Sequence, residues 1–145
     1  MKRKAAGKAK KMEGYAFTTG KRKRAVARAS FRPGSGRIMI NSVPLETMNN
    51  EMVRMKIGEP LVLAGDGWKK FNISVNVRGG GITGQADAAR QAVAKGLAQL
   101  LGDDIKNRFL GYDRHLIVAD PRRTETHKPP RSSQGPRRYK QRSKR

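Results

Sequence analysis

Residues 71–101, FNISVNVRGGGITGQADAARQAVAKGLAQLL, contain the clearest strand and the clearest helix of the chain. Apolar and polar residues alternate over 71–78, which is the pattern of a half-buried strand. The glycines at 79–81 break this strand. From 84 to 101 the apolar residues recur at helical spacing, and Gly102 is a suitable helix stop. The predicted buried faces are Phe71, Ile73, Val75 and Val77 on the strand, and Ala86, Ala89, Val93, Leu97, Leu100 and Leu101 on the helix.

A second alternating stretch, KRKRAVARASF at 21–31, predicts another half-buried strand. The turn residues at 33–36 lead to a strand at 37–41 with Ile38 and Ile40 on its buried side, and the two strands are predicted to form an antiparallel hairpin. One side of the first strand carries Lys21, Lys23, Ala25, Ala27, Ala29 and Phe31, and the other carries a row of arginines, Arg22, Arg24, Arg28 and Arg32.

Three weaker elements complete the expected domain. A weak helical pattern with Leu45, Met48, Met52, Met55 and Ile57 covers 45–57 and is predicted to end at 58–60. A short helix is predicted through Phe109, with Asp103 or Asp104 as its cap. A last strand is predicted at 115–119.

Charge divides the chain into three parts. The chain has 33 Lys plus Arg and 11 Asp plus Glu, which gives a net charge of +22. Ten bases and one acid fall in 1–24 and again in 121–145, whereas 25–120 holds thirteen bases and nine acids. We therefore predict a basic disordered arm at 1–14, a globular domain at 15–120 and an extended basic tail at 121–145. This distribution favours a polyanionic partner.

Composition excludes several classes of protein. There is no cysteine, so a disulfide scaffold and a cysteine-based zinc site are both excluded. The only histidines are His115 and His127, too few for a histidine-rich metal site. No apolar run approaches the ~20 residues of a membrane helix, and the basic start lacks the apolar stretch of a secretory signal. We expect an intracellular protein with no cofactor, no metal, no membrane and no small-molecule substrate.

The glycine loop after the clearest strand has two possible functions and one structural interpretation. Gly79, Gly81 and Gly84 spell G-x-G-x-x-G, and Asp103 lies about twenty residues further on, as in a dinucleotide-binding unit. Asp103 directly follows the helix end, however, rather than a second parallel strand, and the chain is too short for a doubly wound enzyme. Backbone amides at glycines and at a helix start also bind phosphate, and Arg78 adds a charge, so we favour a nucleic-acid phosphate contact over a plain turn.

Two other features point to nucleic acid. Four arginines in a row without interleaved acids repel one another, and an external phosphate backbone would relieve this better than a solvated face. The 25-residue tail could extend on the order of 80 Å. Tyr139 lies among basic residues of this tail and could stack on a nucleotide. The alternative is a non-specific solubilising tail. Asp113, His115 and Asp120 superficially suggest acid–base catalysis, but no nucleophile has a suitable setting nearby, so structural aspartates are favoured.

The motifs together resemble the universal ninth small-subunit ribosomal protein family. They are TGKRKRAVAR at 19–28, RPGSG at 32–36, Asn41, VRGGG at 77–81 followed by Gly84-Gln85, and the SKR ending at 143–145. YDR at 112–114 and VADPRRTE at 118–125 resemble the archaeal and eukaryotic branch. HKP at 127–129 and GPR at 135–137 favour the archaeal type, whereas the last three residues resemble the bacterial ending.

The resemblance implies a fold, a location and a site. The family folds as a small α+β domain, a mixed sheet packed on helices with a left-handed β-α-β crossover, in the head of the cytoplasmic small ribosomal subunit. It binds rRNA beside neighbouring head proteins, is not an enzyme, and extends its tail to P-site tRNA. The expected rRNA contacts are Lys21, Arg22, Lys23, Arg24, Arg28, Arg32, Arg78, Gly79, Gly80, Gly81, Arg122, Arg123, Arg137 and Arg138, and the expected tRNA contacts are Ser143, Lys144 and Arg145. A general chromatin or nucleoid protein is the alternative.

Overall fold

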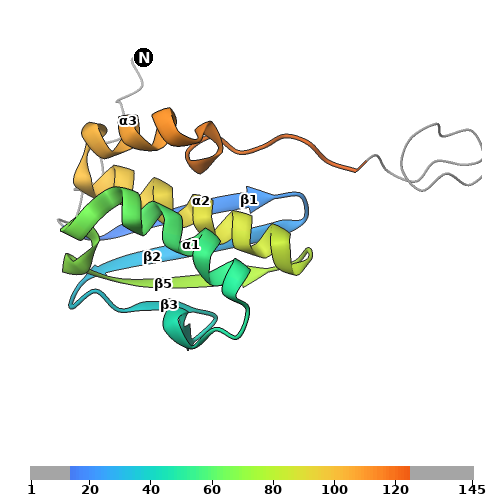
Figure 1. Cartoon of the computed structure of the whole chain (residues 1–145), viewed down its shortest axis with the longest axis horizontal. Helices are drawn as coiled ribbons and strands as arrows, with labels where there is room; N and C mark the ends of the chain where they lie inside the picture. The colour runs from blue at the N-terminus through green and yellow to red at the C-terminus, as the bar shows by residue number, and fades with distance from the viewer. Residues whose placement is uncertain (1–13, 125–145) are drawn as a thin grey trace, which may run out of the picture.

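The protein is an α+β domain in which helices cover one face of a mixed five-stranded sheet (Figure 1). The computed structural model describes residues 14–124. The strands are β1 (Ala16–Arg22), β2 (Ala25–Pro33), β3 (Ile38–Ile40), β4 (Val43–Pro44) and β5 (Phe71–Arg78). The helices are α1 (Glu51–Ala64), α2 (Ile82–Leu101) and α3 (Asp103–Tyr112), with 3₁₀ turns at Leu45–Thr47, Gly65–Lys70 and Arg114–Leu116. This confirms the expected fold class.

The strand order is β1-β2-β5-β3-β4, so β5 lies between β2 and β3. β5 pairs antiparallel with β2 and parallel with β3. The predicted hairpin of β2 with β3 is therefore wrong. Asn41 supports the observed pairing, because its side chain accepts from the Val77 amide at 2.8 Å and donates to the Val77 carbonyl at 3.2 Å. A short-range hairpin signal could not show that a strand thirty residues later would take the central place.

The connection from β3 to β5 through α1 is a β-α-β crossover. In Figure 1 both strands run from left to right, α1 lies in front of the sheet, and the chain rises from β3 to β5. This arrangement is left-handed, as the family resemblance implies, against the usual right-handed preference.

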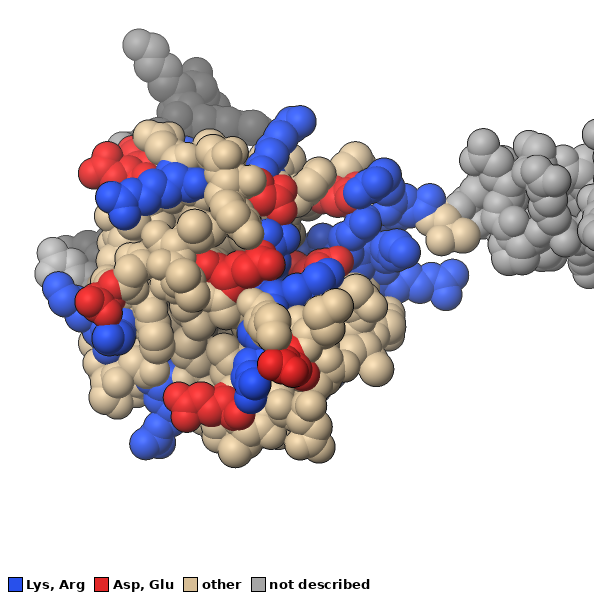
Figure 2. Space-filling view, viewed as in Figure 1, with Lys and Arg blue, Asp and Glu red and all other residues tan. Residues whose placement is uncertain are grey.

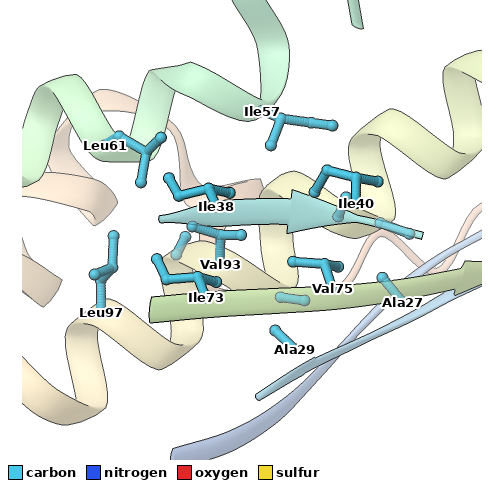
Figure 3. Close-up of a cluster of buried hydrophobic side chains, with 14 of the residues drawn as sticks. Ala27, Ala29, Ile38, Ile40, Ile57, Leu61, Ile73, Val75, Val93 and Leu97 are labelled. Carbon is cyan, nitrogen blue, oxygen red and sulfur yellow. The ribbon is translucent and has the colours of Figure 1, made fainter. Parts of the chain in front are cut away.

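The core lies between the sheet and the helices (Figure 3). Alternation along the strands sends one set of side chains into this core, and the helices supply the opposite wall. The predicted core faces of β2 and β3, and most of those of β5 and α2, are confirmed as buried; Phe71, Leu100 and Leu101 are only partly buried. The buried residues include Ala25, Ala27, Ala29, Phe31, Ile38, Ile40, Ile73, Val75, Val77, Ala86, Ala89, Val93 and Leu97.

Helix α1 differs from its prediction in both bounds. It begins after Asn50, whose side chain accepts from the Val53 amide at 3.3 Å, and it continues through Pro60 to Ala64. Its buried stripe is Val53, Ile57, Pro60, Leu61 and Ala64, whereas Met52 and Met55 are exposed. Burial of this stripe outweighs the one backbone hydrogen bond that a proline removes.

Two predictions after α2 are also wrong. Residues 115–119 form no strand, because the Asp113 carboxylate accepts from the His115 amide at 2.8 Å and turns the chain into a 3₁₀ turn. Neither Asp103 nor Asp104 caps α3 through its side chain. Gly102, with φ +100°, ends α2 and precedes α3. No helix within 14–124 is long and apolar enough to cross a membrane.

Candidate nucleic-acid interface

Within residues 14–124, all helices lie on one face of the sheet, and the opposite face is uncovered and basic. Strand alternation places on it the residues whose neighbours fill the core. The register aligns them across three strands: Thr19 faces Arg28, which faces Asn76, and Ser30 lies between Phe17 and Ser74. The open face thus carries Phe17, Thr19 and Lys21 from β1, Val26, Arg28, Ser30 and Arg32 from β2, and Asn72, Ser74, Asn76 and Arg78 from β5.

Acidic residues are segregated from this face. None of the five described strands contains Asp or Glu. The acids of 25–120 lie in the helices and 3₁₀ turns or between them, except Asp120, which follows the last 3₁₀ turn. On the helical side, shown in Figure 2, acidic and basic side chains are intermixed. Within 14–124, no ion pair involves Arg28, Arg32 or Arg78. These guanidinium groups are therefore available to an external anion.

The β1–β2 turn and the glycine loop meet at one end of the sheet. A Cβ on Gly79 would lie 2.7 Å from the Arg24 carbonyl oxygen, and one on Gly80 would lie 3.0 Å from the Ala25 amide nitrogen. Both glycines have positive φ, +76° and +69°, so this close approach requires glycine. Basic side chains gather at this end of the molecule in Figure 2. The structure thereby brings together two predicted segments, 21–24 and 78–81.

Lys23 occupies a conformation that favours glycine. It lies in the two-residue β1–β2 turn with φ +53°, in the left-handed region. A lysine there costs backbone energy that glycine would avoid. Its presence fits a requirement for positive charge at the tip of the turn.

The predicted arginine row does not form one face. Because the turn at Lys23 and Arg24 divides 21–32 into two strands, Arg22 belongs to β1 and points to the helical side, away from Arg28. Its Nη1 lies 2.9 Å from a carboxylate oxygen of Asp120, and its Nε lies 3.9 Å from Asp87. The expectation that the row lacks acidic partners is therefore wrong at Arg22. Lys21, expected on the apolar side, belongs by alternation to the open face.

Asp120 holds the chain where the C-terminal tail leaves the domain. Its carboxylate is 6% exposed and binds Arg22 on one side and Arg122 on the other, with Arg122 Nη2 at 2.6 Å. Hydrogen bonds from the Arg122 side chain and amide, together with both guanidinium charges, hold the pKa of Asp120 well below its ordinary value. We call Arg22, Asp120 and Arg122 the tail clasp.

Buried Gln91 is a supporting residue that sequence analysis missed. Its side chain accepts from the Lys21 amide at 2.9 Å and donates to the His115 carbonyl at 3.5 Å, so it joins β1 to the segment before the clasp. It is 3% exposed. The available sequence signal was a glutamine on the alanine-rich face of a helix. Since buried polar side chains need hydrogen-bond partners, such a residue indicates a contact with another segment.

The possible acid–base cluster is structural. Asp113 accepts from the His115 amide and from Arg90 at 3.0 Å, and Arg90 also pairs with Glu59. Although partial burial opposes ionisation, the His115 amide and the Arg90 guanidinium hold the pKa of Asp113 below its ordinary value. A carboxylate held in this way is a poor base. Within 14–124, His, Asp and Glu form no group of three suited to a metal.

The dinucleotide hypothesis fails on topology. Asp103 begins α3, and α2 is followed by α3 rather than by a parallel strand. Of the predicted nucleic-acid contacts, Arg123 lies in the described part of the tail, whereas Arg137, Arg138, Ser143, Lys144 and Arg145 lie outside the described residues.

In the part of the chain that the structure describes, an α+β domain presents an uncovered, acid-free basic sheet face and a glycine loop, which are typical of the class of nucleic-acid-binding proteins. The model of the family "Ribosomal protein S9/S16" matches residues 20–145. The small ribosomal subunit protein uS9 of Methanococcus maripaludis (strain S2) is 48% identical over 127 residues, 87% of this chain and 95% of its own. The protein of the same name from Methanococcus vannielii is also 48% identical, with the same coverage.

The chain therefore belongs to the ribosomal protein S9 family. This confirms the resemblance, and both relatives are archaeal. As a member, it is a structural ribosomal protein of the small subunit, an RNA-binding ribonucleoprotein component of translation in the cytoplasm. Neither a chromatin protein nor a nucleotide-dependent enzyme matches this membership.

Proposed function

We propose that the chain binds rRNA in the head of the small subunit through its open sheet face and glycine loop, and extends its tail to P-site tRNA. The observation that carries the rRNA part is the presence of Lys21, Arg28, Arg32 and Arg78 on a sheet face without acids. Its role is structural, with rRNA, tRNA and neighbouring head proteins as partners.

The open face suits a phosphate backbone. Arg28 and Arg32 lie four residues apart on β2, and Arg78 lies opposite Val26 on β5, so the guanidiniums are spread over the sheet. Each can form a bidentate contact with a phosphate. Asn76, Ser74 and Thr19 on the same face can bond to sugar hydroxyls, which distinguish RNA from DNA.

The glycine loop extends this surface to the end of the sheet. Helix α2 begins after Gly81 without a side-chain cap. Its first amides therefore remain available to an anion, beside Arg78 and the Lys23–Arg24 turn. Arg22 contributes from the helical side of the same end, where it also holds Asp120.

The tail clasp gives the tail a fixed origin. Arg122 and Asp120 hold the chain against β1, and residues beyond 124 continue from that point. We propose Arg123, Arg137 and Arg138 as rRNA contacts along the tail, and Ser143, Lys144 and Arg145 as the tRNA contacts. Such contacts to a tRNA backbone would be independent of sequence, as every tRNA must pass the site.

Salt dependence tests the rRNA contact. For Arg28→Ala with Arg32→Ala, we expect the slope of log affinity against log salt for small-subunit rRNA to fall by about 1.5, or ~0.7–0.9 per phosphate. The matched control removes two charges from α3, through Lys106→Ala with Arg108→Ala. Equal slopes for the wild type and the sheet variant would refute the proposed face.

Deletion of 143–145 tests the tail. We expect reconstituted small subunits to assemble normally and to bind P-site tRNA more weakly. A Gln141→Ala variant retains all three proposed tRNA contacts and serves as the control. Unchanged tRNA affinity after the deletion would refute the assigned tail role while leaving the rRNA face intact.

A further inference from the structure

Phe17 is a large apolar side chain on the open, basic face. It lies on β1 and is 74% exposed. The residue opposite on β2 is Ser30, and the next residue across on β5 is Ser74. The ring therefore projects over small polar side chains and contributes nothing to the core.

Two arginines of β2 lie diagonally across from Phe17 in the strand register. Arg28 and Arg32 lie two residues on either side of Ser30, and are thus the diagonal neighbours of Phe17 across the strand pair. Diagonal neighbours lie roughly 7–8 Å apart, within reach of aromatic and long side chains. An exposed aromatic ring beside two arginines that form no ion pair within 14–124 is an arrangement suited to a planar base and its adjoining phosphates.

We propose that Phe17 stacks on an unpaired RNA base whose neighbouring phosphates are bound by Arg28 and Arg32. This inference rests on the proposed rRNA-binding function and specifies what the sheet face selects. An apolar side chain of a protein partner could pack on the ring. That partner would also have to supply acidic residues for the two arginines, because the open face itself has none. RNA meets both requirements with one nucleotide.

Stacking on Phe17 would give the open face a preference for single-stranded RNA. In a duplex the base faces are hidden by stacking, so only the phosphate contacts remain available. A single strand or an extruded nucleotide offers the base as well. The ring would therefore add affinity for unpaired RNA without adding to the salt slope, because stacking displaces no counterions.

Fluorescence tests the contact directly. Trp68 is the only tryptophan, so Phe17→Trp combined with Trp68→Phe places one reporter on the open face. The control combines Tyr112→Trp with Trp68→Phe; Tyr112 is a 59% exposed aromatic on α3, on the helical side. Both variants retain the same basic segments outside the described residues. The probes are a 12-nucleotide mixed-sequence RNA and its duplex, with binding followed separately by anisotropy of labelled RNA.

We expect the single-stranded RNA to quench the Phe17→Trp reporter strongly and the duplex to quench it weakly, with no quenching of the Tyr112→Trp control. Phe17→Ala should weaken single-strand binding by roughly tenfold, whereas Phe17→Leu should not restore it. Equal quenching by both probes, or binding without quenching, would overturn the stacking proposal. If Arg28→Ala with Arg32→Ala also left the salt slope unchanged, the proposed rRNA face itself would fail.

Discussion

Gly20→Ala should destabilise the protein severely, because β1 lies directly against the backbone of α2. A Cβ on Gly20 would lie 2.7 Å from the Ala92 amide nitrogen and closer still to the Ala88 carbonyl oxygen. Favourable contacts between carbon atoms lie near 3.5–4.0 Å, so the strand and helix must separate by roughly 1 Å. Both obstructing atoms are backbone, so no side-chain rotation relieves the contact.

The expected loss in the free energy of unfolding follows from the contacts between β1 and α2 that this separation strains. Three hydrogen bonds cross the same interface: Thr18 Oγ1 to the Ala92 carbonyl at 2.7 Å, the Lys21 amide to Gln91 at 2.9 Å, and Lys95 Nζ to the Thr19 carbonyl at 3.2 Å. Overpacking costs about 1–3 kcal/mol, and weakened hydrogen bonds add about 1 kcal/mol. A gain of ~0.4–1 kcal/mol from the stiffer unfolded chain offsets part of this. We expect a net loss of about 2–3 kcal/mol.

Urea unfolding of the full chain measures the effect, with Gly58→Ala as the matched control. A Cβ on Gly58 would meet no atom within 4 Å, and its place inside α1 predicts a gain of ~0.5–1 kcal/mol. The displaced β1 should also weaken rRNA binding, because it carries Lys21 and one side of the β1–β2 turn. A Gly20→Ala protein as stable as the wild type would refute the inferred close packing of β1 on α2.

Three other perturbations have defined outcomes. Lys23→Gly should leave stability unchanged or raise it by up to about 1 kcal/mol, while lowering the salt slope for rRNA by ~0.7–0.9; a loss of stability in urea would contradict the strained turn. Asp120→Asn should increase amide exchange at 117–124, measured by mass spectrometry, whereas the exposed-site control Asp66→Asn should not. Asp113 has a lowered folded pKa, so its contribution is present above its unfolded pKa of about 4 and lost as pH falls through the folded value. In the Asp113→Asn variant, the urea midpoint of unfolding should therefore fall less steeply as the pH drops below about 4.

Local patterns in the sequence predicted the elements that short-range rules determine. The alternation of 71–78 and the spacing of 84–101 identified β5, α2 and their buried faces, because side-chain direction follows from backbone geometry. The position of β5 between β2 and β3 depends on contacts between distant residues, which no local pattern contains.

The candidate site likewise combines features that local patterns predict with features that depend on contacts between distant residues. Strand alternation predicted that Arg28 and Arg32 point outward from β2 and that Arg78 points outward from β5. That the three share one face depends on the pairing of β2 with β5, which the local patterns did not predict. The two-residue turn at Lys23 and Arg24 could not be predicted, because a positive φ at lysine has no sequence signal, and this turn decides that Arg22 faces Asp120. Likewise, the partners of Gln91 became apparent only from the packing of α2 on β1 and the 115 segment.

Tethered-iron cleavage of rRNA tests most directly whether the open sheet face contacts RNA. The chain has no cysteine, so single-cysteine variants carry one reporter each. Ser74→Cys places it on the open face and Asp104→Cys places it on α3, and each variant is assembled into small subunits. If the open face contacts RNA, rRNA cleavage should be strong from position 74 and weaker from position 104. Cleavage from position 104 with none from position 74 would contradict this contact.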